Sequence, residues 1–229
     1  MIMRTALAAI LLAGPALAQE KVFDFKGITN IEVRNGITVE VIQGDELSIV
    51  GTAINGDVDQ FNIRKFGPWL AVNRNTRWFI FPYGRQDQLH LTVTLPETRS
   101  LKAYDTASIT AAGFSGDRFR GEALQGGSVT LSDFSFDETS LYATEDGTLA
   151  ITGTCNLLEA EAIIGAAITA ENLACTDAQT LTRSAGRVSA SATGLATLDD
   201  SLGGTITLTG GAEIVAELPS DDPAETPAK

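Results

Sequence analysis

Three stretches of the sequence, LKAYDTASITA (101–111), GEALQGGSVTL (121–131) and LYATEDGTLAI (141–151), align with one another without internal gaps. Three more continue the alignment, namely AEAIIGAAITA (160–170), TLTRSAGRVSA (180–190) and LDDSLGGTITL (198–208). The central apolar residue of each copy recurs every 18 to 20 residues: Ile109, Val129, Leu149, Ile168, Val188 and Ile206. A fixed period of this length is typical of a repeat protein whose units stack on their neighbours.

Each copy holds two short alternating segments that are separated by a small residue. Period-two alternation places one set of side chains on one face of a strand. A strand pair this short cannot bury its own apolar face, so we expect successive copies to stack as parallel ladders about 4.8 Å apart. The small residue at the corner allows either a positive φ or a close approach of two backbones. This column reads Ala107, Gly127, Gly147, Ala166, Gly186 and Gly204.

The repeat therefore predicts an all-β fold, a single-stranded parallel β-helix (β-solenoid) with coils of about 20 residues. The alternative is a β-sandwich whose Thr-, Ser- and Ala-rich strands resemble one another by chance. One segment, NLLEAEAIIGAAITAENLA (156–174), prefers a helix by its composition. We still expect a solenoid coil there, because Ile168 and Ala170 fall on the register of the repeat and tertiary context often overrides propensity.

The two cysteines fit the same period. Cys155 and Cys175 are 20 residues apart, which is one repeat, so they should lie on adjacent coils. The expected separation is close to what a disulfide requires. We predict a structural disulfide, with two buried thiols as the alternative. The sequence contains no C-x-x-C motif, so a redox centre is not indicated.

The N-terminal half is also rich in strand patterns. Residues 31–33 and 37–41 flank Asn35-Gly36, which is a strong signal for a tight turn. Further alternating segments follow at 47–50, 61–63, 70–72 and 89–95. We expect these strands to form either further, less regular coils or a cap over the open end of the solenoid, because such an end exposes core residues and unpaired edges.

The two termini differ in composition from the rest of the chain. Residues 1–18 combine Arg4, an apolar run and an Ala16-Leu17-Ala18 cleavage signal, which is typical of a secretory signal peptide. Residues 219–229 hold three prolines and three acids and are predicted to be disordered. We therefore expect one domain over 19–218, exported to the periplasm, the cell surface or the extracellular space. No later segment is apolar enough for a transmembrane helix, and the oligomeric state is left open.

The composition excludes several classes of partner. The formal net charge of −13 argues against a nucleic-acid-binding protein, because neutralising phosphates requires a basic surface. One histidine and two cysteines leave little for a zinc site, and no phosphate-binding or dinucleotide-binding glycine motif is present. We expect no metal and no cofactor.

The sequence resembles a known family. Its opening, VFDFKGITNIEVRNGITVEVIQGDELSIVG (22–51), is followed by copies of a small-Gly-[Ser/Thr]-[Val/Ile/Leu] pattern at 126–129, 146–149 and 203–206. This is similar to the auto-transporter adhesin head family with the GIN domain, over about residues 22–217. Ala107 and Ala166 depart from the pattern by replacing the corner glycine. The resemblance implies an exported β-solenoid with no established enzymatic activity.

Catalytic candidates are few. His90 alternates with Leu89 and Leu91 and is interpreted as a surface residue of a strand. Asp105 and Glu145 occupy one repeat column two coils apart, which is a spacing of about 9–10 Å and suits an inverting glycosidase pair. Polar residues are nevertheless common at corners. The acid pairs at 57/59 and 199/200 lack the spacing of known calcium loops and are interpreted as solvated turn residues.

The most unusual segment is 60–86, which contains five basic residues, no acid and seven of the chain's 15 aromatic residues. Aromatic rings and arginines together suit sugar rings and anionic polymers. The predicted binding residues are Trp69, Arg74, Arg77, Trp78, Tyr83 and Arg85. The alternative is a packed cap whose aromatic side chains cover the end of the solenoid.

Together these patterns predict an exported, non-enzymatic, adhesin-like or cell-envelope interaction module that binds a glycan, an envelope polymer or a protein. Two other functions stay open at this point. One is a carbohydrate-active enzyme on a β-helix, and the other is a purely structural envelope protein without a ligand.

Overall fold

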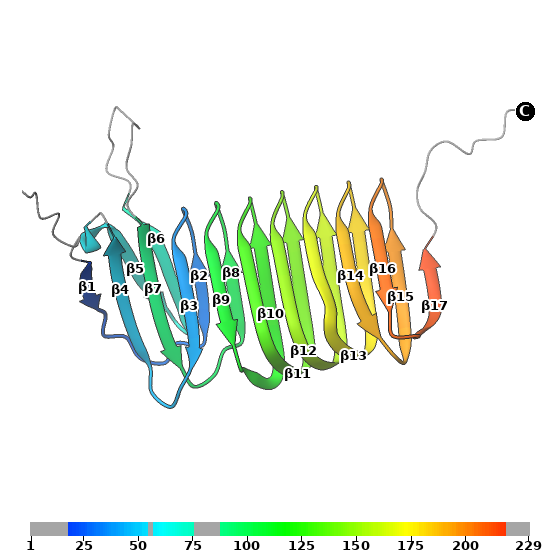
Figure 1. Cartoon of the computed structure of the whole chain (residues 1–229), viewed down its shortest axis with the longest axis horizontal. Coiled ribbons are helices and arrows are strands. Elements are labelled where there is room, and N and C mark those ends of the chain that lie inside the picture. Colours follow the sequence, from blue (N-terminus) through cyan, green and yellow to red (C-terminus); the bar gives the residue numbers. More distant parts are fainter. Residues whose placement is uncertain (1–17, 55–56, 76–87, 219–229) are drawn as a thin grey trace, which may run out of the picture.

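A computed structural model describes residues 18–54, 57–75 and 88–218, and these residues form a narrow rod of stacked coils (Figure 1). The elements are β1 (Gln19–Val22), β2 (Asn30–Val33), β3 (Thr38–Gln43), β4 (Ser48–Ile54), the 3-10 turn η1 (Val58–Gln60), β5 (Phe61–Phe66), β6 (Trp69–Arg74), β7 (Gln88–Leu95), β8 (Ser100–Ala103), β9 (Ser108–Ala112), β10 (Ser115–Leu124), β11 (Ser128–Thr144), β12 (Thr148–Ile163), β13 (Ala167–Arg183), β14 (Arg187–Ala192), β15 (Leu195–Asp200), β16 (Thr205–Thr209) and β17 (Glu213–Leu218). The predicted all-β parallel solenoid is confirmed.

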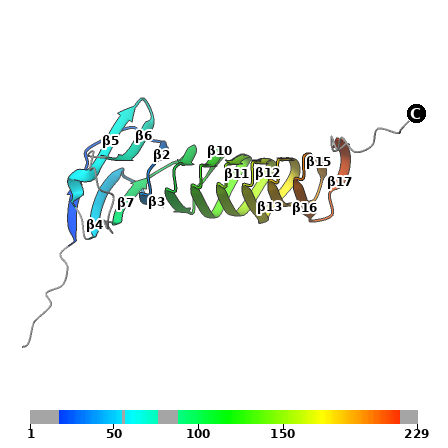
Figure 2. The ribbon, with the colours of Figure 1, turned by 90° about the horizontal axis from the view of Figure 1, so that it is seen from above.

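The strands form two ladders that make up the long sides of the rod (Figure 2). Ladder A runs in the order β5, β6, β2, β8, β10, the second halves of β11, β12 and β13, then β15 and β17. Ladder B runs β1, β4, β7, β3, β9, the first halves of β11, β12 and β13, then β14 and β16. The long strands bend at the lower edge of each coil and so serve both ladders.

The predicted columns match the observed register. Val129 pairs with both Ile109 and Leu149, and the column continues through Ile168 and Val188. These residues are buried and point into the narrow core between the ladders. Small and β-branched side chains fill this core because the two ladders face each other across the width of one flattened coil.

The glycine column is explained by close backbone approach. A Cβ on Gly147 would lie 2.1 Å from the carbonyl oxygen of Ala123 in the preceding coil. The positive φ angles fall one and two positions earlier, at Glu145 (φ 53°) and Asp146 (φ 60°). Each corner therefore uses two left-handed residues to turn the chain, and the small residue that follows lets neighbouring coils come together.

The N-terminal half supplies both coils and a cap. The β2–β3 unit is a coil that lies between the β6–β7 coil and the β8–β9 coil, so the spatial order of the coils differs from their order in the chain. β2 and β3 do not pair with each other: the Gly36 N–H donates to the carbonyl oxygen of Asp105, so Asn35-Gly36 is a solenoid corner. β1, β4 and β5 are antiparallel to their neighbours and close this end of the rod.

The segment with helical preference, 156–174, belongs to β12 and β13, as the repeat register predicts. Backbone pairing with coils on both sides outweighs the modest helix propensity of its Leu, Ala and Glu residues. At its two borders, Cys155 lies opposite Cys175, the Cα atoms are 4.4 Å apart, and the predicted disulfide is present.

Removing this disulfide should destabilise the protein measurably. A 20-residue loop closed by a disulfide loses chain entropy in the unfolded state, so Cys155→Ala with Cys175→Ala is expected to lower the free energy of unfolding by about 3 kcal/mol. Urea unfolding monitored by circular dichroism measures the difference. A reductant should destabilise the wild type by a similar amount and leave the double variant unchanged; equal stability of oxidised wild type and variant would contradict the prediction.

Candidate functional site

Strand alternation turns a continuous set of polar and aromatic side chains outward from the first coils of ladder A. In β8, Leu101 and Ala103 point into the core, so Lys102 points outward. Residues that are paired in neighbouring strands point to the same side of the sheet, so their outward side chains form one surface. We call this surface the outer face of ladder A; over the first coils its residues with aromatic rings or charge are Arg64, Phe66, Trp69, Glu32, Arg34, Lys102, Tyr104, Arg118, Arg120, Glu122, Glu138 and Tyr142.

Trp69 and Lys102 form the first contact of this face. The Lys102 Nζ lies 4.9 Å from the centre of the Trp69 ring, although the two residues come from coils that are not adjacent. The same Nζ lies 3.0 Å from Glu122 Oε2, and Arg120 also pairs with Glu122. Glu122 is only 4% exposed, because these partners cover it. A buried carboxylate with two cationic partners holds both cations in place.

Arg34 and Tyr104 form the second contact. The Arg34 guanidinium lies 4.2 Å from the centre of the Tyr104 ring, and its Nε donates to Glu32 Oε1 at 2.7 Å. The hydrogen bond with Glu32 raises the pKa of Arg34, whereas burial raises the pKa of Tyr104. Arg34 therefore stays charged and Tyr104 stays a neutral phenol around neutral pH.

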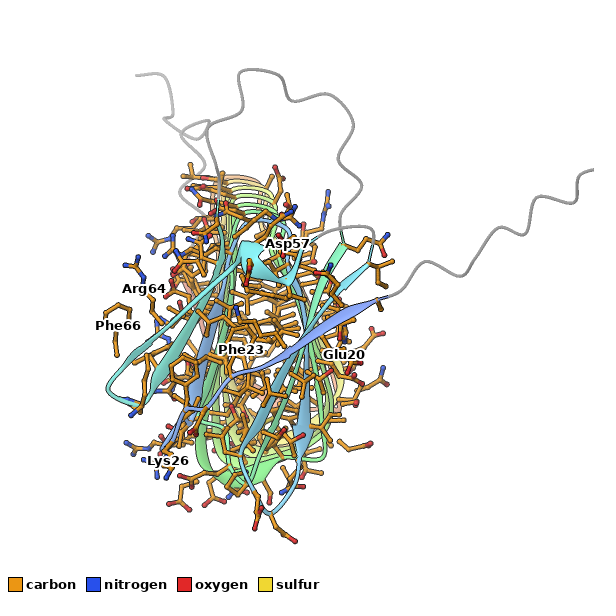
Figure 3. The ribbon with its side chains drawn as sticks, turned by 90° about the vertical axis from the view of Figure 1, so that its left-hand side faces the viewer. Glu20, Phe23, Lys26, Asp57, Arg64 and Phe66 are labelled. Carbon is orange, nitrogen blue, oxygen red and sulfur yellow. A yellow bond between two sulfur atoms is a disulfide. The ribbon has the colours of Figure 1, made fainter. Side chains whose placement is uncertain are left out.

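The β5–β6 hairpin extends this face beyond the body of the rod. Phe66 lies opposite Trp69 in the register, and Arg64 Nε donates to Asn62 Oδ1 at 3.2 Å. Figure 3 shows Arg64 and Phe66 pointing outward from the border of this end, while Phe23 lies over its middle. Phe23 packs edge-on against Phe61, so the aromatic residues here divide into a capping group and an exposed group.

The predicted binding residues are only partly brought together. Trp69 belongs to the outer face of ladder A. Arg74 lies five positions further along β6, which by alternation places it on the opposite side of the strand. The other predicted residues, Arg77, Trp78, Tyr83 and Arg85, lie outside the described residues.

Sequence reasoning missed most of the face. Arg34, Lys102, Tyr104 and Glu122 come from three different coils, and the spatial insertion of the β2–β3 coil brings Arg34 beside Tyr104. One signal was present in the repeat alignment, because Lys102, Glu122 and Tyr142 share one column. The alternation rule assigns that column to the outside of the rod.

The catalytic candidates lie elsewhere. His90 is a half-exposed residue of β7 whose Nε2 lies 3.8 Å from Glu40 Oε2, as expected for a surface strand. Asp105 and Glu145 are corner residues with φ angles of 50° and 53°, and they lie two coils apart with the corner of Gln125 between them. Polar side chains at such left-handed corners fit a structural role in the turn.

An acidic turn lies outside this face, whereas a polar groove shares Arg118 and Glu138 with it. Asp57 Oδ1 accepts the N–H of Asp59, which in turn pairs with Lys21 Nζ at 2.7 Å. No group of three or more metal-binding side chains is found within 18–54, 57–75 and 88–218. Within the same ranges, no helix is long and apolar enough to span a membrane. A polar groove lies at the lower bends, lined by Glu97, Arg99, Asp117, Arg118, Asp137 and Glu138.

Comparison with solved structures shows the same fold in three proteins from bacteria. The chain is similar to a putative adhesin from Bacteroides fragilis (TM-score 0.70, 13% identity, covering 88% of this chain and 95% of that one). It is also similar to a putative lipid binding protein from Parabacteroides distasonis (TM-score 0.62, 14% identity, covering 90% of this chain and 98% of that one). A third similar structure is that of a putative adhesin from Parabacteroides merdae (TM-score 0.57, 13% identity, covering 90% of this chain and 98% of that one). At these identities the likeness concerns the fold alone. No curated protein matches the sequence.

The family assignment rests on the sequence and agrees with the fold. Residues 27–212 match the family described as "Putative auto-transporter adhesin, head GIN domain". The match includes every strand from β2 to β16, so it covers all the coils except β17 and the cap strands except β1. The resemblance inferred from the repeat is thereby confirmed, and the chain belongs to this family of auto-transporter adhesin head domains with the GIN domain.

Proposed function

We propose that the protein is an exported, non-enzymatic, adhesin-like module that binds an acidic polysaccharide of the cell envelope or its surroundings through the outer face of ladder A. The leader-like residues 1–18 support export, with 19–218 as the binding domain and 219–229 as a tail. The membership in an adhesin family supports a binding role.

The charge of the outer face of ladder A is the observation that supports an acidic polysaccharide as the ligand. The chain has a net charge of −13, yet the outer face of ladder A over its first coils has five cations, Arg34, Arg64, Lys102, Arg118 and Arg120, against three carboxylates, Glu32, Glu122 and Glu138. Phe66, Trp69 and Tyr142 add aromatic surface between them. Cations beside aromatic rings suit a polymer that offers both sugar faces and negative groups.

The flat geometry of the face favours a long ligand. Neighbouring coils repeat at about 4.8 Å, so side chains of one column present regularly spaced contacts along the rod axis. Further along the same face, Glu159 and Glu161 replace the cations. The cationic part is thus confined to the N-terminal coils, and this is where we place the ligand.

Binding can be tested with heparin as an acidic probe and dextran as a neutral one. The wild type is expected to bind immobilised heparin but not dextran, and added salt should weaken the binding because it screens the charges. Arg34→Ala with Arg64→Ala should lower the affinity about tenfold or more, since each cation contributes a charge-assisted contact. Surface plasmon resonance measures both effects.

The matched control is Arg187→Ala, which removes an exposed arginine of ladder B from β14. It should leave heparin binding unchanged. An equal loss in this control, or no binding to acidic polysaccharides, would overturn the proposal. Release of oligosaccharides that is abolished by Asp105→Asn or Glu145→Gln would instead support the carbohydrate-active enzyme.

A further inference from the structure

The C-terminal end of the rod exposes its core. In one inward column of ladder A, Ala178 and Ala196 are each 1% exposed, whereas the next residue, Ile214, is 48% exposed. Among the described residues, β17 pairs only with β15 and β16 only with β14. The last coil therefore presents two free strand edges around an uncovered apolar layer, which is a surface that favours strand addition.

Charge limits what can cover this end. The charged residues of 195–218 are all acidic, and Asp200 and Glu213 are exposed. Residues 219–229 follow directly, but their three prolines lack the N–H groups that a strand donates, and their three acids would face acids. A second C-terminal end would bring the same acids together. The occupant must therefore be a strand with basic residues.

The N-terminal end of the same rod offers such a strand. β5 is the outermost strand of ladder A and, among the described residues, pairs only with β6. It presents Arg64 and Lys65, both exposed and without an ion pair to a described residue, followed by Phe66 at 61% exposure. Its other edge pairs with no described strand, and it lies at the end of the rod opposite to β17 (Figure 1).

We propose that the rods associate head to tail, with β5 of one copy adding to the free edge of β17 of the next. β17 is parallel to the strands of ladder A, whereas β5 is antiparallel to them. The new pair is therefore antiparallel and continues ladder A from one molecule into the next. By strand alternation Arg64 and Phe66 lie on the same outer side of the joined ladder as Glu213, so Arg64 faces Glu213, while Lys65 lies on the inner side. A heterologous contact of this kind does not close on itself, so it generates filaments.

Sedimentation velocity of the purified protein, without polysaccharide, tests this association. The wild type is expected to form species that grow with protein concentration and shrink with added salt. Arg64→Glu with Lys65→Glu makes both ends acidic, and Asp200→Lys with Glu213→Lys makes both ends basic, so each variant alone should sediment as a monomer. All four residues are exposed, and circular dichroism should show that both variants fold as the wild type does.

Mixing the two variants separates the possible arrangements. Head-to-tail association predicts that the mixture recovers species larger than a dimer, because each acidic end then meets a basic one. Recovery of heterodimers only would show tail-to-tail pairing and overturn the proposal. A wild type that stays monomeric over the attainable concentration range, or assembly that persists in either single variant, would overturn it as well.

Discussion

Replacing Gly153 with alanine is expected to lower the free energy of unfolding by about 3 to 5 kcal/mol. Gly153 has a φ of 137°, and a Cβ there would lie 1.8 Å from the carbonyl oxygen of Phe134. The backbone reaches this geometry at the lower bend, where the pairing of β11 with β12 shifts register between Leu131 and Phe134. Because the clash is with backbone, no side-chain rotation can relieve it.

Gly203→Ala provides the matched control for this substitution. Gly203 also has a positive φ, 77°, but a Cβ there would meet no atom within 4 Å. The free energy of unfolding of the Gly203→Ala variant should therefore fall by only about 1 kcal/mol, because the backbone conformation is the single unfavourable feature. Urea unfolding of both variants isolates the cost of the close approach, and similar losses in the two would contradict this account of the bend.

Phe134→Ala should have a comparable effect, about 3 to 5 kcal/mol, because it opens a cavity in the most aromatic part of the core. Phe134 is buried, and its ring centre lies 4.9 Å from that of Phe119, 5.7 Å from Phe136 and 5.8 Å from Phe114. These rings fill the core at the lower bend of the coils. Phe119 and Phe136 are themselves 5.3 Å apart, so all four rings form one cluster.

The control for Phe134→Ala is Phe66→Ala, which removes an equally large side chain from an exposed position. Phe66 is 61% exposed at the tip of the β5–β6 hairpin, so its loss should change the stability by less than about 0.5 kcal/mol. Thermal and urea unfolding compare the two variants. A Phe66 variant as unstable as the Phe134 variant would show that the hairpin contributes as much to the stability as the lower bend does.

Several features could be read from single positions in the repeat. The pairing of Cys155 with Cys175 followed from a spacing of one coil. The inward direction of Ile168 identified its segment as strand despite its helical composition. In both cases the information is local to one repeat or shared by two neighbouring repeats, and stacking then fixes it without reference to the rest of the chain.

Other features depended on contacts that no local pattern encodes. Asn35-Gly36 has the sequence of a hairpin turn, yet its strands pair with other coils. The β2–β3 coil is inserted between two coils formed later in the chain, which brings Arg34 to Tyr104. Trp69 was predicted within a basic segment, but its cationic partner is Lys102 from a distant repeat.

The sequence by itself indicated the solenoid, its coil length, the inward columns and the disulfide, because copies of a short alternating pattern bury their apolar face by stacking on one another. Only the tertiary structure decided the order of the N-terminal coils, the composition of the outer face of ladder A and the difference between the closed and the open end of the rod. Ladder pairing is a backbone interaction that any strand can make, so the choice of neighbour depends on how the whole chain packs. The side chains that meet on the surface follow from that choice.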